Sequence, residues 1–397
     1  MSYADLAKEA NQYSNVLSEI RRELHQIPEF GLQLPKTLAR VLESVHGLGE
    51  ITLSKNITSA VLHIKGSQPG PTVLLRADMD ALAVIEDTGL DFASTNGYMH
   101  ACGHDLHMAM GIGAAHLIAT HKDDLKGDVI IWFQPGEEGH GGADVMLEEG
   151  MHLVTGQMPI AAYGIHVFSS YPKGMFGSKA GALMAAAGGM TVTFKGSGGH
   201  GSMPWLSKDP ISPMSEAISA LQVMVNKRFS AFDPVVINVG WVKAGDDHTE
   251  NVIPETASFG ATIRTFSVEN TDKVKRLSTE LLEAIAKAHG VEVEINFLPS
   301  TKVLINDAAS IERVERVIGE AFGSSRYWTM PDPIAGGEDF ASVVDIIPGA
   351  FVFMGACPDD IDPSTASTNH SNKALFDDSV LADGAALLAS LAFDTLA

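Results

Sequence analysis

The densest group of side chains able to bind a metal lies in one short segment, residues 100–107, which reads HACGHDLH. Cys102 and His104 are two residues apart, so we expect both to point the same way from an extended segment. Thiolate and imidazole are ligands suited to Zn²⁺ and its neighbours. A buried cysteine beside surface histidines is the alternative. Three histidines, one cysteine and one aspartate within eight residues favour the metal site.

A second candidate group is the carboxylate pair Glu137 and Glu138, which follows the apolar segment 128–133. Sheets of α/β proteins place their active-site loops at such positions. Adjacent carboxylates point in different directions, so one can bind a metal while the other holds an attacking water as general base. For this pair alone, an acidic surface turn is an equally good interpretation.

Asp78 and Asp80 form a third group at the end of the apolar segment 72–77. At strand spacing they share one face, and either could orient a metal-bound histidine by a hydrogen bond. A role in a turn or a helix cap stays open for each aspartate.

Two single histidines, His166 and His370, are more often structural than ligands when they stand alone. His166 ends an apolar segment, and His370 lies in a polar loop. They become candidate ligands because a two-metal site needs more protein contacts than Cys102, His104 and Glu138 supply.

The glycine-rich segment 196–201, GSGGHG, matches the spacing of a dinucleotide-binding loop. Such a loop should open directly into a helix, but Pro204 and Pro210 follow and the neighbouring apolar residues alternate. The pattern therefore disfavours a dinucleotide site, and His200 is better placed to donate a hydrogen bond to a substrate oxygen.

Near-continuous apolar segments alternate with helical ones over most of the chain, which predicts an α/β fold with a central, mostly parallel sheet buried on both faces. The expected strands are 59–65, 72–77, 128–133, 160–167 and 351–353. The first helix is expected within residues 2–26, and the other expected helices are about 36–46, 105–121, 307–323 and 379–396.

Residues 182–299 differ, because their strands alternate apolar and polar residues in the order β-α-β-β-α-β. This order is ferredoxin-like. We therefore expect an inserted domain at 182–299, within a larger domain formed by residues 1–181 and 300–397.

Charge and composition narrow the class of protein. Lys and Arg number 27 against 49 Asp and Glu, a net charge of −22, which argues against nucleic-acid and anionic-membrane partners. No apolar run is long enough to span a membrane, and the first residues lack a signal peptide's apolar stretch. Two cysteines are no disulfide framework, so we expect a cytoplasmic protein.

Seven motifs in order resemble the M20 metallopeptidase/amidohydrolase family, in particular its hippurate hydrolase and auxin-conjugate hydrolase branch. They are RADMDAL, HACGHDLH, QPGEEG, YGIHV, GSGGHGSMP, NVIPETASFGATIRTF and GGEDF.

The resemblance implies a catalytic α/β domain with two divalent ions and an inserted lid domain through which two chains form a homodimer. It implies that the two ions are bound by five ligands, Cys102, His104, Glu138, His166 and His370. Glu137 would be the general base and Asp80 would orient a residue of the metal site. Asp78 stands where other branches carry a histidine ligand, so no ligand role is assigned to it. His200 would reach an active site, its own or that of the partner.

The expected reaction is hydrolysis of the amide of an N-acyl-amino acid. Long-range attraction of its carboxylate by so acidic a chain is not expected, so a local cation must hold it. Arg264 is the candidate, with Asn251 as a neutral partner. The soft thiolate ligand favours Zn²⁺. The branch that this sequence resembles is similar to enzymes that use Mn²⁺, Co²⁺ or Ni²⁺. A dipeptidase or aminopeptidase of the same fold, a dinucleotide-dependent oxidoreductase and a non-catalytic metal-binding protein are the alternatives.

Overall fold

The computed structural model describes residues 2–397 and divides into two compact units. The first unit comprises Met1–Leu183, Ile305–Asp332 and Asp339–Ala397. The second unit comprises Met184–Leu304 and Pro333–Glu338. The chain thus leaves the first unit twice, at Met184 and at Pro333, and returns to it each time.

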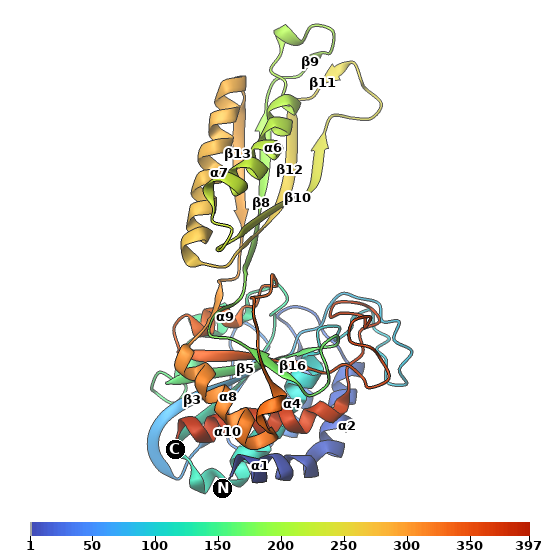
Figure 1. The fold of residues 1–397 in the computed structure, drawn as a ribbon. Coiled ribbons are helices and arrows are strands. Elements are labelled where there is room, and N and C mark those ends of the chain that lie inside the picture. Colours follow the sequence, from blue (N-terminus) through green and yellow to red (C-terminus); the bar gives the residue numbers. More distant parts are fainter. Residues whose placement is uncertain (1) are drawn as a thin grey trace. The chain divides into compact units, whose positions relative to one another are not determined.

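The first unit is built on a mixed eight-stranded sheet with the order β1-β2-β4-β3-β5-β16-β6-β15 (Figure 1). Its centre is parallel, because β3 pairs in parallel with β4 and β5, and β5 with β16. Antiparallel pairs join β1 to β2, β2 to β4 and β6 to β16. The strands are β1 (Glu50–Leu53), β2 (Ala60–Lys65), β3 (Gln68–Asp78), β4 (Lys126–Gln134), β5 (Ala161–Phe168), β6 (Phe176–Ser178), β15 (Tyr327–Thr329) and β16 (Gly349–Gly355).

Both faces of this sheet are buried, as the continuous apolar segments predict. Along β4, Ile131 packs into the same core as helices α4 and α10, whereas the neighbouring Trp132 points to the opposite face and donates to the Met151 carbonyl oxygen. The helices are α1 (Tyr3–Ala10), α2 (Ser14–Gln26), α3 (Pro35–Ser44), α4 (His104–Thr120), α5 (Gly142–Glu148), α8 (Ala308–Phe322), α9 (Phe340–Val344) and α10 (Leu381–Thr395).

Helix α4 carries the first metal-binding motif into the core. It is buried almost all round, and it packs on α2, α10 and β3. A helix that is apolar on every side is typical of a protein interior. Its first residue, His104, therefore lies inside the molecule.

The helical segment expected within residues 2–26 is divided into the two helices α1 and α2. The segment Asn11–Tyr13 is a 3₁₀ turn between α1 and α2. The Asn11 side chain donates to the Ala7 carbonyl oxygen at 3.0 Å. This local bond competes with regular helix and is a common reason for such breaks.

The second unit is a four-stranded antiparallel sheet with the order β10-β12-β8-β13 and two helices, α6 and α7, that pack on each other (Figure 1). Its own core contains Phe194, Phe259 and Leu282. The elements are β8 (Ala186–Lys195), α6 (Ile211–Arg228), β10 (Val235–Ala244), β12 (Thr256–Thr265), α7 (Val268–His289) and β13 (Glu292–Leu298).

Shorter strands complete the chain. A two-stranded ladder joins β9 (Gly199–His200) to β11 (Val252–Ile253) within the second unit. The strands β7 (Gly181–Met184) and β14 (Leu304–Asn306) contain two of the positions where the chain passes between the units. Within residues 2–397, no helix has the length and apolarity needed to cross a membrane.

Candidate metal centre and active site

The loop before α4 positions Cys102 and His104, but not as an extended segment, so that expectation is wrong. Gly103 has a φ of +84° and His104 begins the helix. The two side chains still converge because the left-handed turn at Gly103 folds the chain back. A Cβ on residue 103 would lie 2.3 Å from Val167 Cγ2, so only glycine fits this turn.

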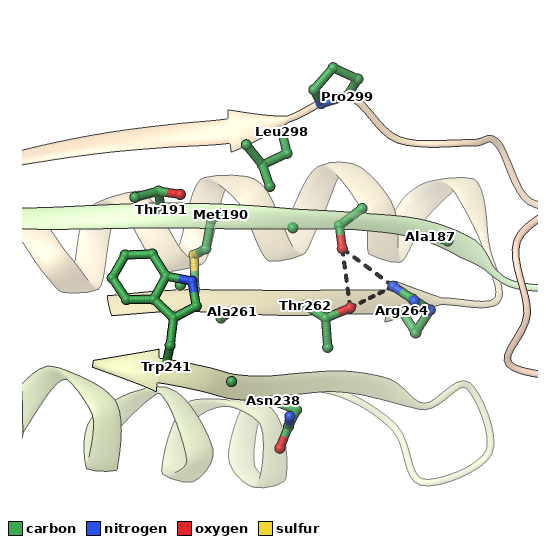
Figure 2. A pocket seen from close by; sticks show the side chains of 14 residues that line it. Ala187, Met190, Thr191, Asn238, Trp241, Ala261, Thr262, Arg264, Leu298 and Pro299 are labelled. Atoms are coloured by element: carbon green, nitrogen blue, oxygen red, sulfur yellow. Dashed lines mark hydrogen bonds between the residues drawn. The ribbon is translucent and has the colours of Figure 1, made fainter. Parts of the chain in front are cut away.

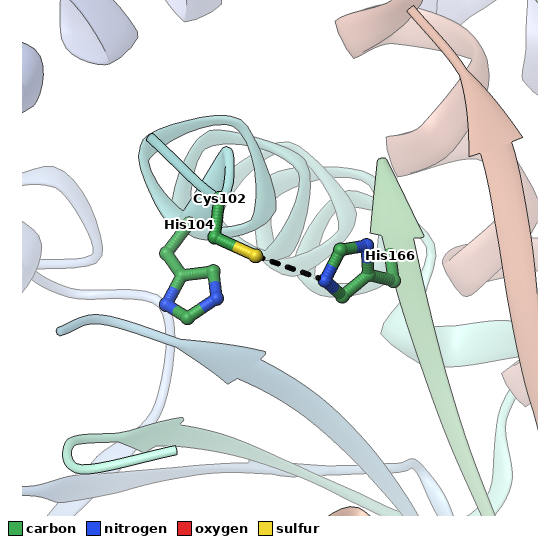
Figure 3. A group of neighbouring side chains, drawn as sticks. All are labelled: Cys102, His104 and His166. Carbon is green, nitrogen blue, oxygen red and sulfur yellow. Dashed lines mark hydrogen bonds between the residues drawn. The ribbon is translucent and has the colours of Figure 1, made fainter. Parts of the chain in front are cut away.

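Cys102 lies between two histidines that come from distant parts of the chain. Its Sγ is 3.3 Å from His166 Nε2, on strand β5, and 3.3 Å from His370 Nε2, in the loop before α10. His370 Nε2 is also 3.2 Å from Glu138 Oε1. Figure 3 shows Cys102 and His166 facing each other, with His104 on the other side of the thiol.

His104 presents its Nε2 atom to this group. Its Nδ1 is 2.8 Å from the Asp80 carbonyl oxygen, which sets the tautomer and leaves Nε2 as the acceptor. Nε2 lies 4.0 Å from Glu138 Oε1 and 4.0 Å from Glu137 Oε2. The ring is fully buried, so its orientation is held by the core.

Two groups of metal-binding atoms share the Cys102 thiol. Cys102, His104 and His166 form one, and Cys102, Glu138 and His370 form the other, with the ligand atoms of each group within 4.8 Å of one another. The structure therefore brings together all five residues that the sequence analysis singled out as ligands.

The glutamate pair is held by Asp80. Its Oδ1 accepts the backbone N–H of Glu137 and its Oδ2 that of Glu138, both at 3.0 Å. The Asp80 side chain thus anchors the loop that carries both glutamates. Its contact with His104 is made mainly through the backbone carbonyl oxygen.

Asp78 orients a histidine that the sequence analysis left without a role. His107 Nδ1 is 2.6 Å from Asp78 Oδ1, and His107 Nε2 accepts the Val167 N–H at 2.8 Å. Burial would raise the pKa of Asp78, but Arg76 and the imidazoles of His104 and His107 hold it well below its usual range. The charged Asp78 carboxylate therefore lies next to the candidate metal site, and it already accepts a hydrogen bond from Arg76 at 2.6 Å.

A further buried network supports the same edge of the sheet and was missed from sequence. Arg76 donates to Gln134 Oε1 at 3.0 Å and to Asp339 Oδ1 at 3.1 Å. Asp339 also accepts the Ala143 N–H at 2.9 Å, in the first turn of α5. The GGEDF motif at 336–340 is the signal that could have indicated Asp339.

His370 is held in a strained backbone conformation. Its φ of 70° makes it the non-glycine residue with positive φ among residues 2–397. Its N–H donates to the Ala101 carbonyl oxygen at 2.9 Å, and the neighbouring Asn369 side chain donates to the Val167 carbonyl oxygen at 2.9 Å. Such strain persists only where surrounding bonds impose it, and it is common at functional sites.

The donor set fits divalent cations. Buried nitrogen atoms with no hydrogen-bond partner among the described residues include His104 Nε2 and His166 Nδ1. Hydrogen bonds to Cys102 and Glu138 raise the pKa of His370 to about 10, so these groups attract positive charge to its Nε2. Burial holds the pKa of His166 well below its usual value and keeps the ring in the neutral form that binds metals.

The remaining candidates lie in the second unit. Arg264 stands in a pocket on the open face of the sheet, together with Thr262, Asn238 and Trp241 (Figure 2). Its guanidinium donates to Thr262 Oγ1 at 2.6 Å and to the Ala335 carbonyl oxygen at 3.1 Å, so its position is set by the fold.

His200 and Asn251 are both exposed and lie close together, because β9 pairs with β11. His200 Nδ1 is 2.9 Å from Ser202 Oγ, and the Asn251 carbonyl oxygen accepts the Gly201 N–H at 2.7 Å. The segment 196–201 contains β9, and the next α-helix begins only at Ile211. It is therefore no dinucleotide-binding turn of the strand-loop-helix kind.

A model of peptidase family M20/M25/M40 matches residues 74–394. The chain belongs to this family. Its members hydrolyse amide bonds, and the metal-binding groups around Cys102 agree with that chemistry. The M20 match begins in β3 and ends in α10, so it spans both units.

Curated relatives cover most of this M20 chain. Thermostable carboxypeptidase 1 of Saccharolobus solfataricus is 33% identical over 393 residues, which is 98% of this chain and 97% of that protein. N-acetylcysteine deacetylase of Bacillus subtilis is 37% identical over 344 residues, 85% of this chain and 88% of that protein. IAA-amino acid hydrolase ILR1-like 4 of Arabidopsis thaliana is 32% identical over 395 residues, which is 98% of this chain and 88% of that protein.

A solved M20 structure supports the same placement. The YXEP protein of Bacillus subtilis, described as a dinuclear metal binding peptidase, is 32% identical and superposes with a TM-score of 0.81. The superposition covers 97% of this chain and 99% of that one.

Proposed function

We propose that this protein is a metal-dependent amidohydrolase that cleaves N-acyl-amino acids to a carboxylic acid and a free amino acid. The observation that carries the proposal is the position of Glu137 beside the group of five ligands around Cys102, in an M20 chain. Relatives named as N-acetylcysteine deacetylase and IAA-amino acid hydrolase support this substrate class.

Two divalent ions would be held by the five ligands. Cys102 would be shared, with His104 and His166 on one side and Glu138 and His370 on the other. Zn²⁺ or Mn²⁺ is the proposed metal, with Co²⁺ and Ni²⁺ as further options, because the set combines thiolate, imidazole and carboxylate. Bound ions of this kind polarise a carbonyl group and lower the pKa of water.

Glu137 is the proposed general base. Its carboxylate takes a proton from water as the water oxygen bonds to the amide carbon. The same proton then passes to the leaving nitrogen when the carbon–nitrogen bond breaks. Glu138 is assigned as ligand because its Oε1 lies 3.2 Å from His370 Nε2. Asp80 would position both glutamates through their N–H groups.

Arg264 and Asn251 are proposed to bind the substrate carboxylate, and His200 to donate a hydrogen bond to the amide oxygen. Arg264 is suited to this because the fold holds its guanidinium at the edge of an open pocket. The side chain of His200 is exposed, and the active site in which it is proposed to act is either its own or that of a second chain.

A homodimer through the second unit is proposed as the assembly. Strand β10 is an edge of the sheet and exposes Val236, Trp241 and Val242. Long apolar edge strands invite pairing with another chain. Light scattering on the purified protein tests it, and a monomer at all concentrations would refute it.

Both cysteines are unpaired, which suits a reducing compartment, and we propose the cytoplasm.

A peptidase of the same fold is the second candidate, because a carboxypeptidase is 33% identical over nearly the whole chain. The test is a substrate panel with the metal-loaded protein, in which released amino groups are measured. N-acetyl- and N-benzoyl-amino acids should show kcat/KM at least about tenfold above that of free dipeptides with the same C-terminal residue. The reverse order would refute the amidohydrolase and favour the peptidase.

A further inference from the structure

In the first unit, Phe30 contacts two other exposed ring side chains. Phe30 and Tyr98 stack with their ring centroids 6.0 Å apart and an interplanar angle of 4°. Phe30 meets the His140 ring edge-on at 4.8 Å. Phe30 is 41% exposed and Tyr98 37%, so part of each side chain is accessible to a ligand. We call Phe30, Tyr98 and His140 the aromatic cluster.

Each ring of the aromatic cluster is connected closely to the candidate active site. His140 lies two residues after Glu138, in the same turn, where its N–H donates to the Gly136 carbonyl oxygen at 3.2 Å. Phe30 pairs by a backbone bridge with Ala81, the neighbour of Asp80. The Asp80 carboxylate in turn accepts the Glu137 N–H.

Tyr98 closes the loop that separates the two parts of the site. This loop begins after Asp80 and ends before Cys102, and Leu82 and Met99 bridge its two ends. The aromatic cluster therefore lies on the edge of the sheet that carries the glutamate pair, at the carboxyl ends of β3 and β4.

Hydrogen bonds hold the loop that carries Tyr98. The Tyr98 N–H donates to Asn96 Oδ1 at 3.1 Å, and the Asn96 side chain donates to the Pro28 carbonyl oxygen at 2.8 Å. Earlier in the loop, the Ser94 N–H donates to Glu86 Oε2 at 2.6 Å, and Glu86 Oε1 lies 3.1 Å from His25 Nε2. Rings that are ordered in advance lose little entropy when they bind a flat group.

We propose that the aromatic cluster determines specificity for the acyl group, by binding a flat, apolar acyl chain of the substrate against Phe30 and Tyr98. This inference rests on the proposed function, and it assigns the acyl side of the scissile bond to the first unit. The occupant is the substrate's own acyl group, because Tyr98 lies in the loop between Asp80 and Cys102, and Phe30 pairs with Ala81 next to Asp80. Ring contacts of this kind favour aromatic over small acyl groups.

The test compares N-benzoyl and N-acetyl derivatives of one amino acid, with metal-loaded full-length protein. For Phe30→Ala and for Tyr98→Ala, the ratio of kcat/KM for benzoyl over acetyl should fall by about threefold to tenfold. The ratio should fall because KM for the benzoyl substrate rises, while kcat changes little, since the rings do not touch the reacting atoms. Tyr98→Phe, which keeps the ring, should retain the ratio.

Phe232→Ala is the matched control, because Phe232 is fully exposed in the second unit, and its ratio should equal that of the unchanged protein. Calorimetric titration with sodium benzoate supplies a readout that does not require turnover, and the affinity should fall for both alanine variants. Hydrolysis with an unchanged ratio and unchanged benzoate affinity overturns the assignment of the aromatic cluster. If neither acyl substrate is hydrolysed while benzoate affinity still depends on the rings, the proposed reaction fails and the cluster assignment stands.

Discussion

His370 Nε2 lies 3.3 Å from Cys102 Sγ, although 268 positions separate the two residues in the chain. The contact joins the loop before α10 to the turn before α4. It is made from a strained backbone, since φ of His370 is 70°. Tertiary contacts therefore hold the two loops together, among them the hydrogen bond from the His370 N–H to the Ala101 carbonyl oxygen.

Replacement of His370 by alanine should remove one ligand from the centre. We expect metal affinity at one site to fall by at least about 100-fold, because a lost ligand costs more than a lost supporting hydrogen bond. Elemental analysis after dialysis checks this, with about half the metal of the unchanged protein as the expected result. His46→Ala, at an exposed position in the same unit, is the control. Full metal content in His370→Ala would contradict the assignment.

Glu137→Gln should abolish turnover and leave the metal in place. Amide oxygen and nitrogen cannot take a proton from water, so kcat should fall by about 10²- to 10⁴-fold. Turnover and metal content are measured on the same preparation. Loss of metal together with activity would mean that Glu137 is a ligand and that the roles of Glu137 and Glu138 are exchanged.

Asp80→Asn should displace the glutamate pair. Both carboxylate oxygens of Asp80 accept N–H groups, at 3.0 Å each, and asparagine would direct an NH₂ group at one of these donors. The unfolding free energy should fall by about 1–3 kcal/mol, and kcat should fall with it. Urea unfolding and steady-state kinetics measure the two effects. Asp91→Asn, at an exposed position, should change neither.

Gly103→Ala tests the turn that brings Cys102 and His104 together. Its φ is +84° and a Cβ there would lie 2.3 Å from Val167 Cγ2. Gly156→Ala is the matched control, with φ of +83° and no atom within 4 Å of its Cβ. Both variants carry the backbone cost of about 1 kcal/mol. Only Gly103→Ala should also lose metal, and equal metal content in the two would show that the close packing is unimportant.

Glu86→Gln should weaken stability in a pH-dependent way. Burial would raise the pKa of Glu86, but hydrogen bonds from His25 and Thr88 outweigh it and lower the pKa to about 2. A carboxyl group with a lowered folded pKa stabilises the protein above its unfolded pKa of about 4.3, and this stability is lost as the pH falls toward 2.

The difference in unfolding free energy between unchanged protein and Glu86→Gln should therefore be largest near pH 6 and shrink between pH 4.5 and pH 3. Urea unfolding at a series of pH values measures it. Burial would lower the pKa of the neighbouring His25, but Asp105 and Glu86 together raise it above its usual value in the unchanged protein. A difference that stays constant down to pH 3 would refute the ionic role of Glu86.

Some features of this protein follow from the sequence alone. Continuous apolar segments determine β4, β5 and β16, because a strand buried on both faces needs apolar residues at every position. The short strands β1, β6 and β15 were not predicted, since three or four residues carry too little periodicity. Ligand chemistry is also local, and HACGHDLH, the glutamate pair and the ordered motifs identify the M20 family without coordinates.

The tertiary structure alone decided how these residues meet. It replaced the extended segment at Cys102 with a left-handed turn, and it placed the Asp80 side chain on the glutamate loop. It also paired Asp78 with His107 and Arg76 with Asp339. Periodicity reports only which face of an element is apolar. The partners of buried charges come from elements far apart in the chain, so packing selects them.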